Sequence, residues 1–116
     1  MERMKYMIVD DNAGMREMIR LNIPAEGNDF LECPSGADAV AQFSRFRPDF
    51  VMMDIEMKGM DGFAATEKIY EQDPQAKIIF VTDHDTSAFH TKAKKLHAAG
   101  FVSKENLSEI AGLLRL

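Results

Sequence analysis

Short, continuously apolar runs alternate along this chain with longer amphipathic stretches, and this alternation restricts the fold more than any other feature. Three runs are clear, at residues 6–9, 50–53 and 78–81, and two weaker ones lie at residues 30–31 and 101–102. Runs of this length with no polar face are typical of strands buried on both sides of a parallel sheet. The order predicts five strands, each followed by a helix, with helices on both faces of one sheet.

The stretches between these runs have the spacing and the end signals of α-helices. Helices are predicted over residues 12–23, 36–46, 62–71 and 87–97, and a last one begins near residue 106. Ser35 and Asp38 form a predicted capping box at the start of the second helix. Asn106 is expected to cap the last helix, and Gly100 to follow the end of the fourth.

Composition sets limits on the class of protein. The chain has 116 residues, of which 46% are hydrophobic, which suits one domain with a single core. Its net charge of -5 argues against direct nucleic-acid binding. The single cysteine, Cys33, excludes an intrachain disulfide and is interpreted as a small core residue. The sequence has neither a signal-peptide pattern nor an apolar run of about 20 residues, so a cytoplasmic protein without membrane contact is predicted.

Polar side chains gather where the predicted strands end. They are Asp10 and Asp11 after the first strand, Asp54 after the third, Thr82 and Asp83 after the fourth, and Ser103 and Lys104 after the fifth. Each residue alone is typical of a turn, a cap or a solvated surface. Ligands of an open parallel sheet, however, bind beyond the carboxyl ends of its strands. Clustered carboxylates stay ionised most easily around a cation, and hard oxygen ligands with retained waters are typical of Mg²⁺.

In this order and spacing, the residues resemble the receiver domains of two-component response regulators along almost the whole chain. The matching segments are Asp10-Asp11, Met53-Asp54-Ile55-Glu56-Met57 with the loop to Gly62, Val81-Thr82, and Phe101-Val-Ser-Lys104. The resemblance implies a flavodoxin-like, doubly wound (βα)5 fold, with a five-stranded parallel sheet, over residues 1–116. Two arrangements stay open, a stand-alone regulator and the N-terminal module of a larger regulator whose output domain lies outside this chain.

The resemblance also implies the chemistry. Asp54 is expected to accept a phosphoryl group from a sensor histidine kinase or a histidine phosphotransfer protein, in a reaction that depends on Mg²⁺ and for which Mn²⁺ is a possible substitute. The expected metal ligands are Asp10 (through a water), Asp11, Asp54 and the backbone carbonyl of Glu56. Gain and loss of the phosphoryl group would be self-catalysed, so the domain is not expected to be a conventional enzyme.

Three further matched residues carry the expected response to phosphorylation. Lys104 would pair with Asp54 and then with the phosphoryl oxygens, and Thr82 would donate its hydroxyl to them. Phe101 would then turn inward. That movement would change the surface of the fourth helix, fifth strand and fifth helix, where an output domain or a target protein would bind.

Several positions depart from the family pattern or flank the site. Lys58 and Glu105 stand where prolines are common. A cis bond before a non-proline residue costs about 2.5–4 kcal/mol, so the Lys104–Glu105 bond is predicted to be trans. Asp83 stands where a small residue is usual, and its side chain either points to solvent or repels the incoming phosphate. Glu56 and His84 occupy positions that tune reaction rates in receivers.

Two other functions stay open on the sequence. A receiver-like interaction module that is never phosphorylated would keep the fold, and Asp83, Lys58 and Glu105 leave room for it. A Mg²⁺-dependent phosphatase with an aspartyl nucleophile would need a second Asp two residues after the first, where this chain has Glu56. The complete set of Asp10, Asp11, Asp54, Thr82 and Lys104 favours the phosphorylated switch.

Overall fold

The computed structural model describes residues 3–114, which form five strands, five α-helices and one short 3₁₀ helix. The strands are β1 (Lys5–Val9), β2 (Asp29–Cys33), β3 (Phe50–Met53), β4 (Ile78–Thr82) and β5 (Gly100–Ser103). The helices are α1 (Ala13–Arg20), α2 (Gly36–Phe46), α3 (Gly62–Gln72), α4 (Ser87–Lys95) and α5 (Ile110–Leu113), with the 3₁₀ helix η1 (Leu107–Glu109) before α5. The predicted alternation of strands and helices is confirmed, and the outermost residues of the predicted domain, 1–2 and 115–116, lie outside the described part.

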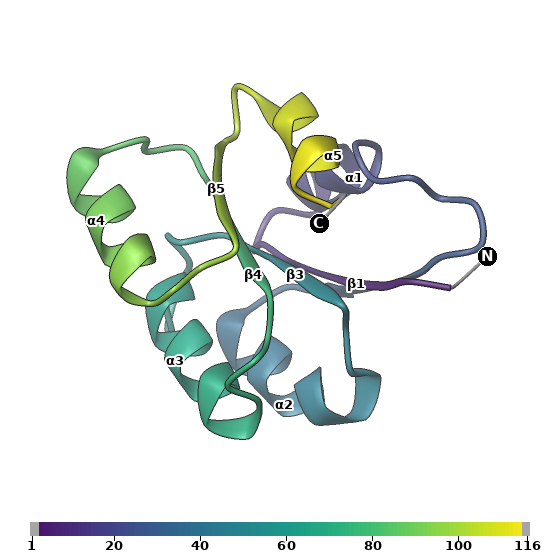
Figure 1. The fold of residues 1–116 in the computed structure, drawn as a ribbon, viewed down its shortest axis with the longest axis horizontal. Coiled ribbons are helices and arrows are strands. Elements are labelled where there is room, and N and C mark those ends of the chain that lie inside the picture. The colour runs from purple at the N-terminus through teal and green to yellow at the C-terminus, as the bar shows by residue number, and fades with distance from the viewer. Residues whose placement is uncertain (1–2, 115–116) are drawn as a thin grey trace.

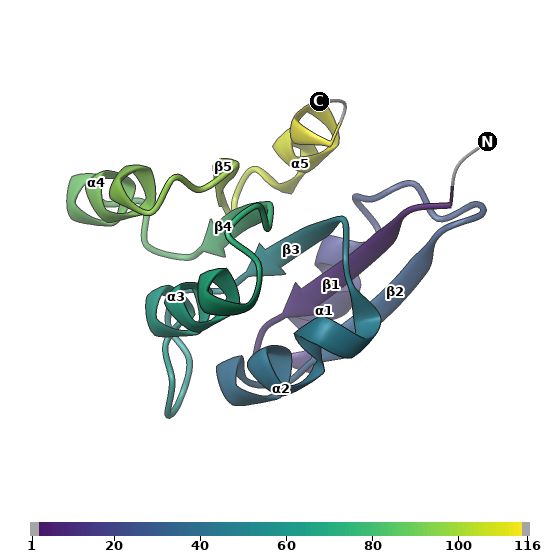
Figure 2. The same cartoon turned by 60° about the horizontal axis from the view of Figure 1, so that its bottom comes forward.

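All neighbouring strands pair in parallel, in the order β2-β1-β3-β4-β5. Figure 2 shows β2, β1 and β3 side by side at the centre of the molecule. The chain moves outward from β1 in one direction to β2 and in the other to β3, β4 and β5. Loops that leave β1 and β3 therefore diverge at the switch point where such sheets bind ligands.

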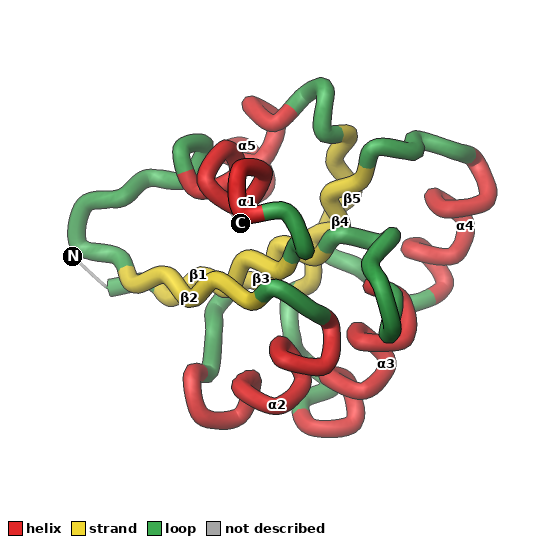
Figure 3. The backbone as a smooth tube through the Cα atoms, turned by 180° about the vertical axis from the view of Figure 1, so that it is seen from behind, coloured by secondary structure: helices red, strands yellow, loops and turns green. Residues whose placement is uncertain are grey.

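Helices cover both faces of the sheet, with α1 and α5 on one side and α2, α3 and α4 on the other (Figures 1 and 3). Alternate strand residues point to opposite faces. Tyr6 and Ile8 pack with Ile19 of α1 and Ile110 of α5, whereas their neighbour Met7 packs in the α2, α3 and α4 core. This two-sided burial explains why the strands are apolar throughout.

Several helix ends differ from the sequence prediction, beginning with α1, which ends at Arg20 and not at residue 23. Helix α4 ends at Lys95, and His97, not a glycine, takes the left-handed conformation with φ of 58°. Gly100 instead lies in β5, where a Cβ atom would sit 2.6 Å from a side-chain carbon of Leu113 in α5. The side chain of Asn106 makes no capping hydrogen bond within the described residues, and the chain first forms the 3₁₀ turn η1 there.

The predicted capping box at α2 is only half formed. The Ser35 side chain accepts a hydrogen bond from Asp38 N (3.0 Å), as predicted, but the Asp38 carboxylate accepts one from the Gln42 side chain.

Cys33 is fully buried, and burial raises the pKa of its thiol to about 12, which agrees with its interpretation as a core residue. No helix among residues 3–114 is long and apolar enough to cross a membrane.

Candidate functional site

The loops after β1, β3, β4 and β5 bring the predicted site residues to one edge of the sheet. Because β1 pairs with β3, Asp10 lies beside Asp54, and because Thr82 pairs with Ser103, Lys104 leaves β5 one residue beyond Thr82. The backbone ladder continues one residue past the strands, from Asp54 N to Val9 O (2.9 Å) and from Lys104 N to Thr82 O (2.8 Å). Sheet register therefore fixes where these side chains leave the backbone.

Asp10, Asp11 and Asp54 form an acidic triad. Each offers one carboxylate oxygen, and the three atoms all lie within 4.8 Å of one another. Asp10 and Asp54 are buried, whereas Asp11 is exposed. Three carboxylate oxygens at this spacing, with one open side, have the chemistry that a hydrated divalent cation such as Mg²⁺ requires.

Asp10 is held by hydrogen bonds and by one ion pair. Its Oδ1 accepts a hydrogen bond from Asn12 N (2.9 Å), and its Oδ2 lies 2.9 Å from the ammonium group of Lys104. Its backbone N donates to Cys33 O (3.1 Å), and its backbone carbonyl accepts from the Arg16 guanidinium (2.6 Å). Asp10 is therefore held rigidly, and Arg16 is a residue of this site that the sequence interpretation missed.

Lys104 reaches three carboxylates from the end of β5. Its Nζ is 2.9 Å from Asp10, 3.3 Å from Asp54 and 3.8 Å from Asp83, and its side chain is only 9% exposed. Burial alone would lower the pKa of Lys104, but the hydrogen bond to Asp10 and the charge of Asp54 outweigh it, so the pKa is raised. Lys104 thus stays charged, and it divides its charge between Asp10 and its predicted partner Asp54.

The surroundings of Asp54 disfavour its ionised form. Burial and the negative charge of Asp10 raise its pKa from 3.8 to about 6, and Lys104 only partly opposes them. The neighbouring positive charge of Lys104 therefore does not fully compensate the burial and repulsion of ionised Asp54. A cation between the acidic residues would supply that charge and return the pKa toward its ordinary value.

The Thr82 hydroxyl is buried and already bonded. Its Oγ1 accepts a hydrogen bond from His84 N (3.1 Å) in the loop after β4. The neighbouring Asp83 side chain is 67% exposed, yet its carboxylate lies 3.8 Å from the Lys104 ammonium. Asp83 thus faces solvent and also lies near the ammonium group that neutralises Asp54, and its repulsion of an incoming phosphate stays a prediction.

Glu56 and His84 face each other across the rim of the site. His84 Nδ1 contacts Glu56 Oε1, and the pair joins the loop after β3 to the loop after β4. Both side chains are more than half exposed. The contact places two of the three predicted rate-tuning residues, which also include Asp83, next to each other at the rim of the site, and it holds the Glu56 carboxylate against His84.

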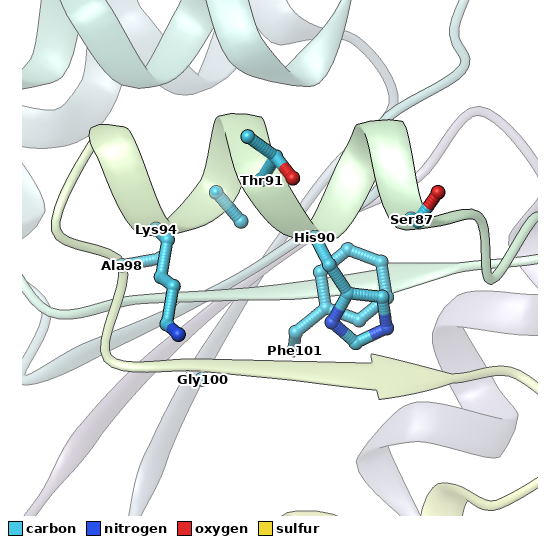
Figure 4. A pocket seen from close by; sticks show the side chains of 8 residues that line it. Ser87, His90, Thr91, Lys94, Ala98, Gly100 and Phe101 are labelled. Atoms are coloured by element: carbon cyan, nitrogen blue, oxygen red, sulfur yellow. The ribbon is translucent and has the colours of Figure 1, made fainter.

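The predicted switch residue Phe101 lies on β5, away from the acidic triad. Its ring is half-buried, and the His90 ring of α4 stacks against it with centroids 3.9 Å apart. Figure 4 shows the two rings together in a pocket of about 500 Å³ between α4 and β5. His90 also contacts the Asp85 carboxylate, so one side chain links Phe101 to the β4–α4 loop.

The loop from Asp54 to α3 is held by close backbone packing. A Cβ atom at Gly62 would lie 2.0 Å from Asp54 O, so only glycine fits there. Gly59 adopts a positive φ of 76°, and Lys58 beside it is exposed. On the other side of the site, the Lys104–Glu105 peptide bond is trans, as predicted.

The arrangement matches a known family. The family model of the response regulator receiver domain matches residues 6–115 of the 116. The chain belongs to this family. Receiver domains act in two-component regulatory systems, and phosphorylation on an aspartate is their general function.

Sequence relatives agree with this assignment, and a solved structure has the same fold. The chain is 37% identical over 100 residues to the chemotaxis protein CheY of Halobacterium salinarum, covering 86% of this chain and 83% of the relative. It is 30% identical over 115 residues to the response regulator GacA of Pseudomonas syringae pv. syringae, covering 97% of this chain but 54% of the relative. The structure of Vibrio cholerae CheY4 is similar in fold, with a TM-score of 0.88 at 22% identity, and it covers 98% of both chains. The chain thus spans most of a CheY protein and about half of GacA.

Proposed function

We propose that Asp54 accepts a phosphoryl group from a phosphohistidine, in an Mg²⁺-dependent reaction, and that this switches the surface formed by α4, β5 and α5. The observation that carries the proposal is the meeting of Asp10, Asp11 and Asp54 within 4.8 Å, beside Lys104. The phosphoryl donor would be a sensor histidine kinase or a histidine phosphotransfer protein. The receiver of the signal would be an output domain or a target protein.

The acidic triad suits the metal that the family uses. Asp11 and Asp54 would bind the cation directly, together with the backbone carbonyl of Glu56. Asp10 already has a partner for each of its oxygens, so it is better placed to accept from a metal-bound water. Mg²⁺, or Mn²⁺ in its place, would neutralise negative charge on the transferring group.

The chain's own residues would perform the transfer. Asp54 has a pKa of about 6 and is mostly ionised at neutral pH, so one of its oxygens can attack the phosphorus of the donor. A P–O bond forms as the P–N bond breaks, and the donor imidazole leaves with the P–N electron pair. The Nζ atom of Lys104 lies 3.3 Å from Asp54 Oδ1, and its charge would stabilise the negative charge on the phosphoryl oxygens. Loss of the phosphoryl group by hydrolysis would be self-catalysed at the same site.

Thr82 would begin the response. Its hydroxyl accepts a hydrogen bond from His84 N, and moving the side chain toward the phosphoryl group to donate there would break that bond and reshape the β4–α4 loop. Phe101 would then turn inward, out of its stack with His90. The two states differ in these contacts, and only such differences can couple phosphorylation to the surface.

Asp83 is expected to slow phosphorylation. Its carboxylate is 3.8 Å from Lys104, so it both withdraws positive charge and repels an incoming phosphate. We predict that Asp83→Ala and Asp83→Asn react faster with acetyl phosphate by a factor of up to about five, since exposed charge pairs are worth up to about 1 kcal/mol. Equal rate constants for the wild type and both variants would assign Asp83 to the solvated surface instead.

Labelling with phosphate tests the proposed function. The wild type should gain one acid-stable, base-labile phosphoryl group from radioactive acetyl phosphate with Mg²⁺, and none with EDTA. Asp54→Asn should gain none under either condition, while thermal unfolding shows that it is folded. Absence of labelling in the wild type would favour the interaction module that is not phosphorylated. Location in the cytoplasm and lack of nucleic-acid binding stay predictions from the sequence.

A further inference from the structure

Arg16 connects helix α1 to the loop that carries the acidic pair. Its side chain is only 14% exposed and bridges two acceptors. The Nη1 atom donates to the backbone carbonyl of Asp10 (2.6 Å), and the Nε atom donates to Glu32 Oε1 on β2 (2.9 Å). A planar guanidinium can hold two acceptors in a fixed relative orientation, which the single ammonium of a lysine cannot.

The carbonyl that Arg16 holds belongs to the peptide between Asp10 and Asp11. This peptide is planar, so fixing its carbonyl also fixes the direction in which the chain continues into Asp11. The Asp10 side chain and backbone N are already held by Asn12, Lys104 and Cys33. Asp11 is exposed, and its carboxylate reaches the triad only if the backbone presents it correctly.

We propose that Arg16 is a positioning residue for the metal site. It sets the Asp10–Asp11 peptide so that Asp11 meets Asp54 at the distance a shared cation needs, and Glu32 anchors the guanidinium from the neighbouring strand. The proposal rests on the proposed function, because it assumes that the acidic triad binds a divalent cation. Residues that orient metal ligands without touching the metal affect metal affinity strongly.

Electrostatics and positioning predict opposite effects for the loss of Arg16. A positive charge near the triad repels a divalent cation, so removing only the charge would tighten cation binding. Removing the hydrogen bond to Asp10 would instead free the Asp11 carboxylate and weaken binding. If a folded Arg16 variant binds the divalent cation more weakly, the loss of the Arg16 charge cannot be the cause, and the loss of positioning is.

Arg20 provides a matched control on the same helix. It lies one turn after Arg16, its Nη1 is 3.4 Å from the same Glu32 carboxylate, and its guanidinium sits over the Phe30 ring at 4.5 Å. Arg20→Met removes the same charge and one contact of Glu32 but leaves the Arg16 bond to Asp10 in place. Its effect on cation binding should come from charge alone.

The test is an Mn²⁺ titration of the metal-binding equilibrium, with free Mn²⁺ followed by electron paramagnetic resonance and folding checked by circular dichroism. Arg16→Met should bind Mn²⁺ about tenfold more weakly than the wild type. Arg20→Met should bind as tightly as the wild type or slightly more tightly, and Asp11→Asn gives the effect of losing a ligand.

Two further variants keep the test decisive if Arg16→Met does not fold. Arg16→Lys keeps the charge but has a single donor nitrogen in place of Nε and Nη1, and Glu32→Gln weakens the anchor, so both should show intermediate losses of affinity. Undiminished Mn²⁺ affinity in the folded Arg16 variants would overturn the positioning role while leaving the proposed function intact. Absence of Mn²⁺ binding by the unsubstituted protein would overturn the metal requirement itself, and with it this role of Arg16.

Discussion

At the scale of single residues, Gly62 is the glycine at which a side chain would meet the closest backbone contact, where the loop from Asp54 joins α3. Its missing side chain lets the first turn of α3 pack directly on the Asp54 carbonyl, which a Cβ atom would approach to 2.0 Å. Gly62 N also donates to Ile55 O (2.8 Å), so the two segments cannot separate without losing a hydrogen bond. The loop therefore gains its shape from a backbone contact and not from side chains.

We predict that Gly62→Ala destabilises the domain by about 3 kcal/mol or more, because a clash with backbone atoms cannot be relieved by a rotamer change. Gly112→Ala is the control, since nothing lies within 4 Å of its Cβ position and alanine favours a helix by up to about 1 kcal/mol. Urea unfolding measures both changes. A Gly62→Ala variant as stable as the wild type would contradict the packing of α3 on Asp54.

The residues of the acidic triad could be located from the sequence, whereas Arg16 and Glu32 could not. Asp10, Asp11 and Asp54 directly follow strongly apolar runs, and parallel strands present such residues at one edge. Arg16 looks like any charged residue of an amphipathic helix. Its function depends on the contact of α1 with β2, and the partners Arg16 and Glu32 are sixteen positions apart.

At the scale of elements, helix α4 and strand β5 carry the expected response to phosphorylation, and His90 joins them. It stacks on Phe101 and contacts Asp85 of the preceding loop. A ring stack between two elements leaves no local pattern, so the sequence did not single out His90. The left-handed end of α4 was missed for a similar reason: His97 N bonds to Lys94 O and Ala98 N to Ala93 O, and no glycine marks the turn.

We predict that His90→Ala makes activation easier. Removing the ring frees Phe101 to turn inward, and an aromatic pair is worth about 0.5–1.5 kcal/mol, so affinity for beryllofluoride with Mg²⁺ should rise by roughly two- to tenfold. Thr91→Ala, which changes the next residue of the same pocket, should leave the affinity unchanged. Weaker binding by His90→Ala would show that the stack belongs to the activated form.

At the scale of the whole domain, the proposed phosphorylation site destabilises the fold when Asp54 is ionised. Burial and Asp10 raise the pKa of Asp54 from 3.8 to about 6, so the folded state binds this proton more tightly than the unfolded state does. The stability that comes from this proton is fully present below about pH 4 and is lost as the pH rises through about 6. The shift corresponds to about 3 kcal/mol at most, a large share of the stability of a small domain.

Asp54→Asn should remove this dependence in the metal-free protein, because asparagine has nearly the same shape and does not titrate. We predict that, in EDTA, the variant and the wild type have similar free energies of unfolding at pH 4, and that the variant is more stable by about 2–3 kcal/mol at pH 7.5. Urea unfolding across this range measures the difference.

Glu71→Gln is the control: it removes one negative charge from an exposed residue of α3, and it should retain the wild-type dependence of stability on pH. A constant difference between Asp54→Asn and the wild type from pH 4 to 7.5 would mean that Asp54 is not destabilised when ionised. Mg²⁺ at pH 7.5 should then stabilise the wild type but not Asp54→Asn, because the cation supplies the charge that burial denies to Asp54.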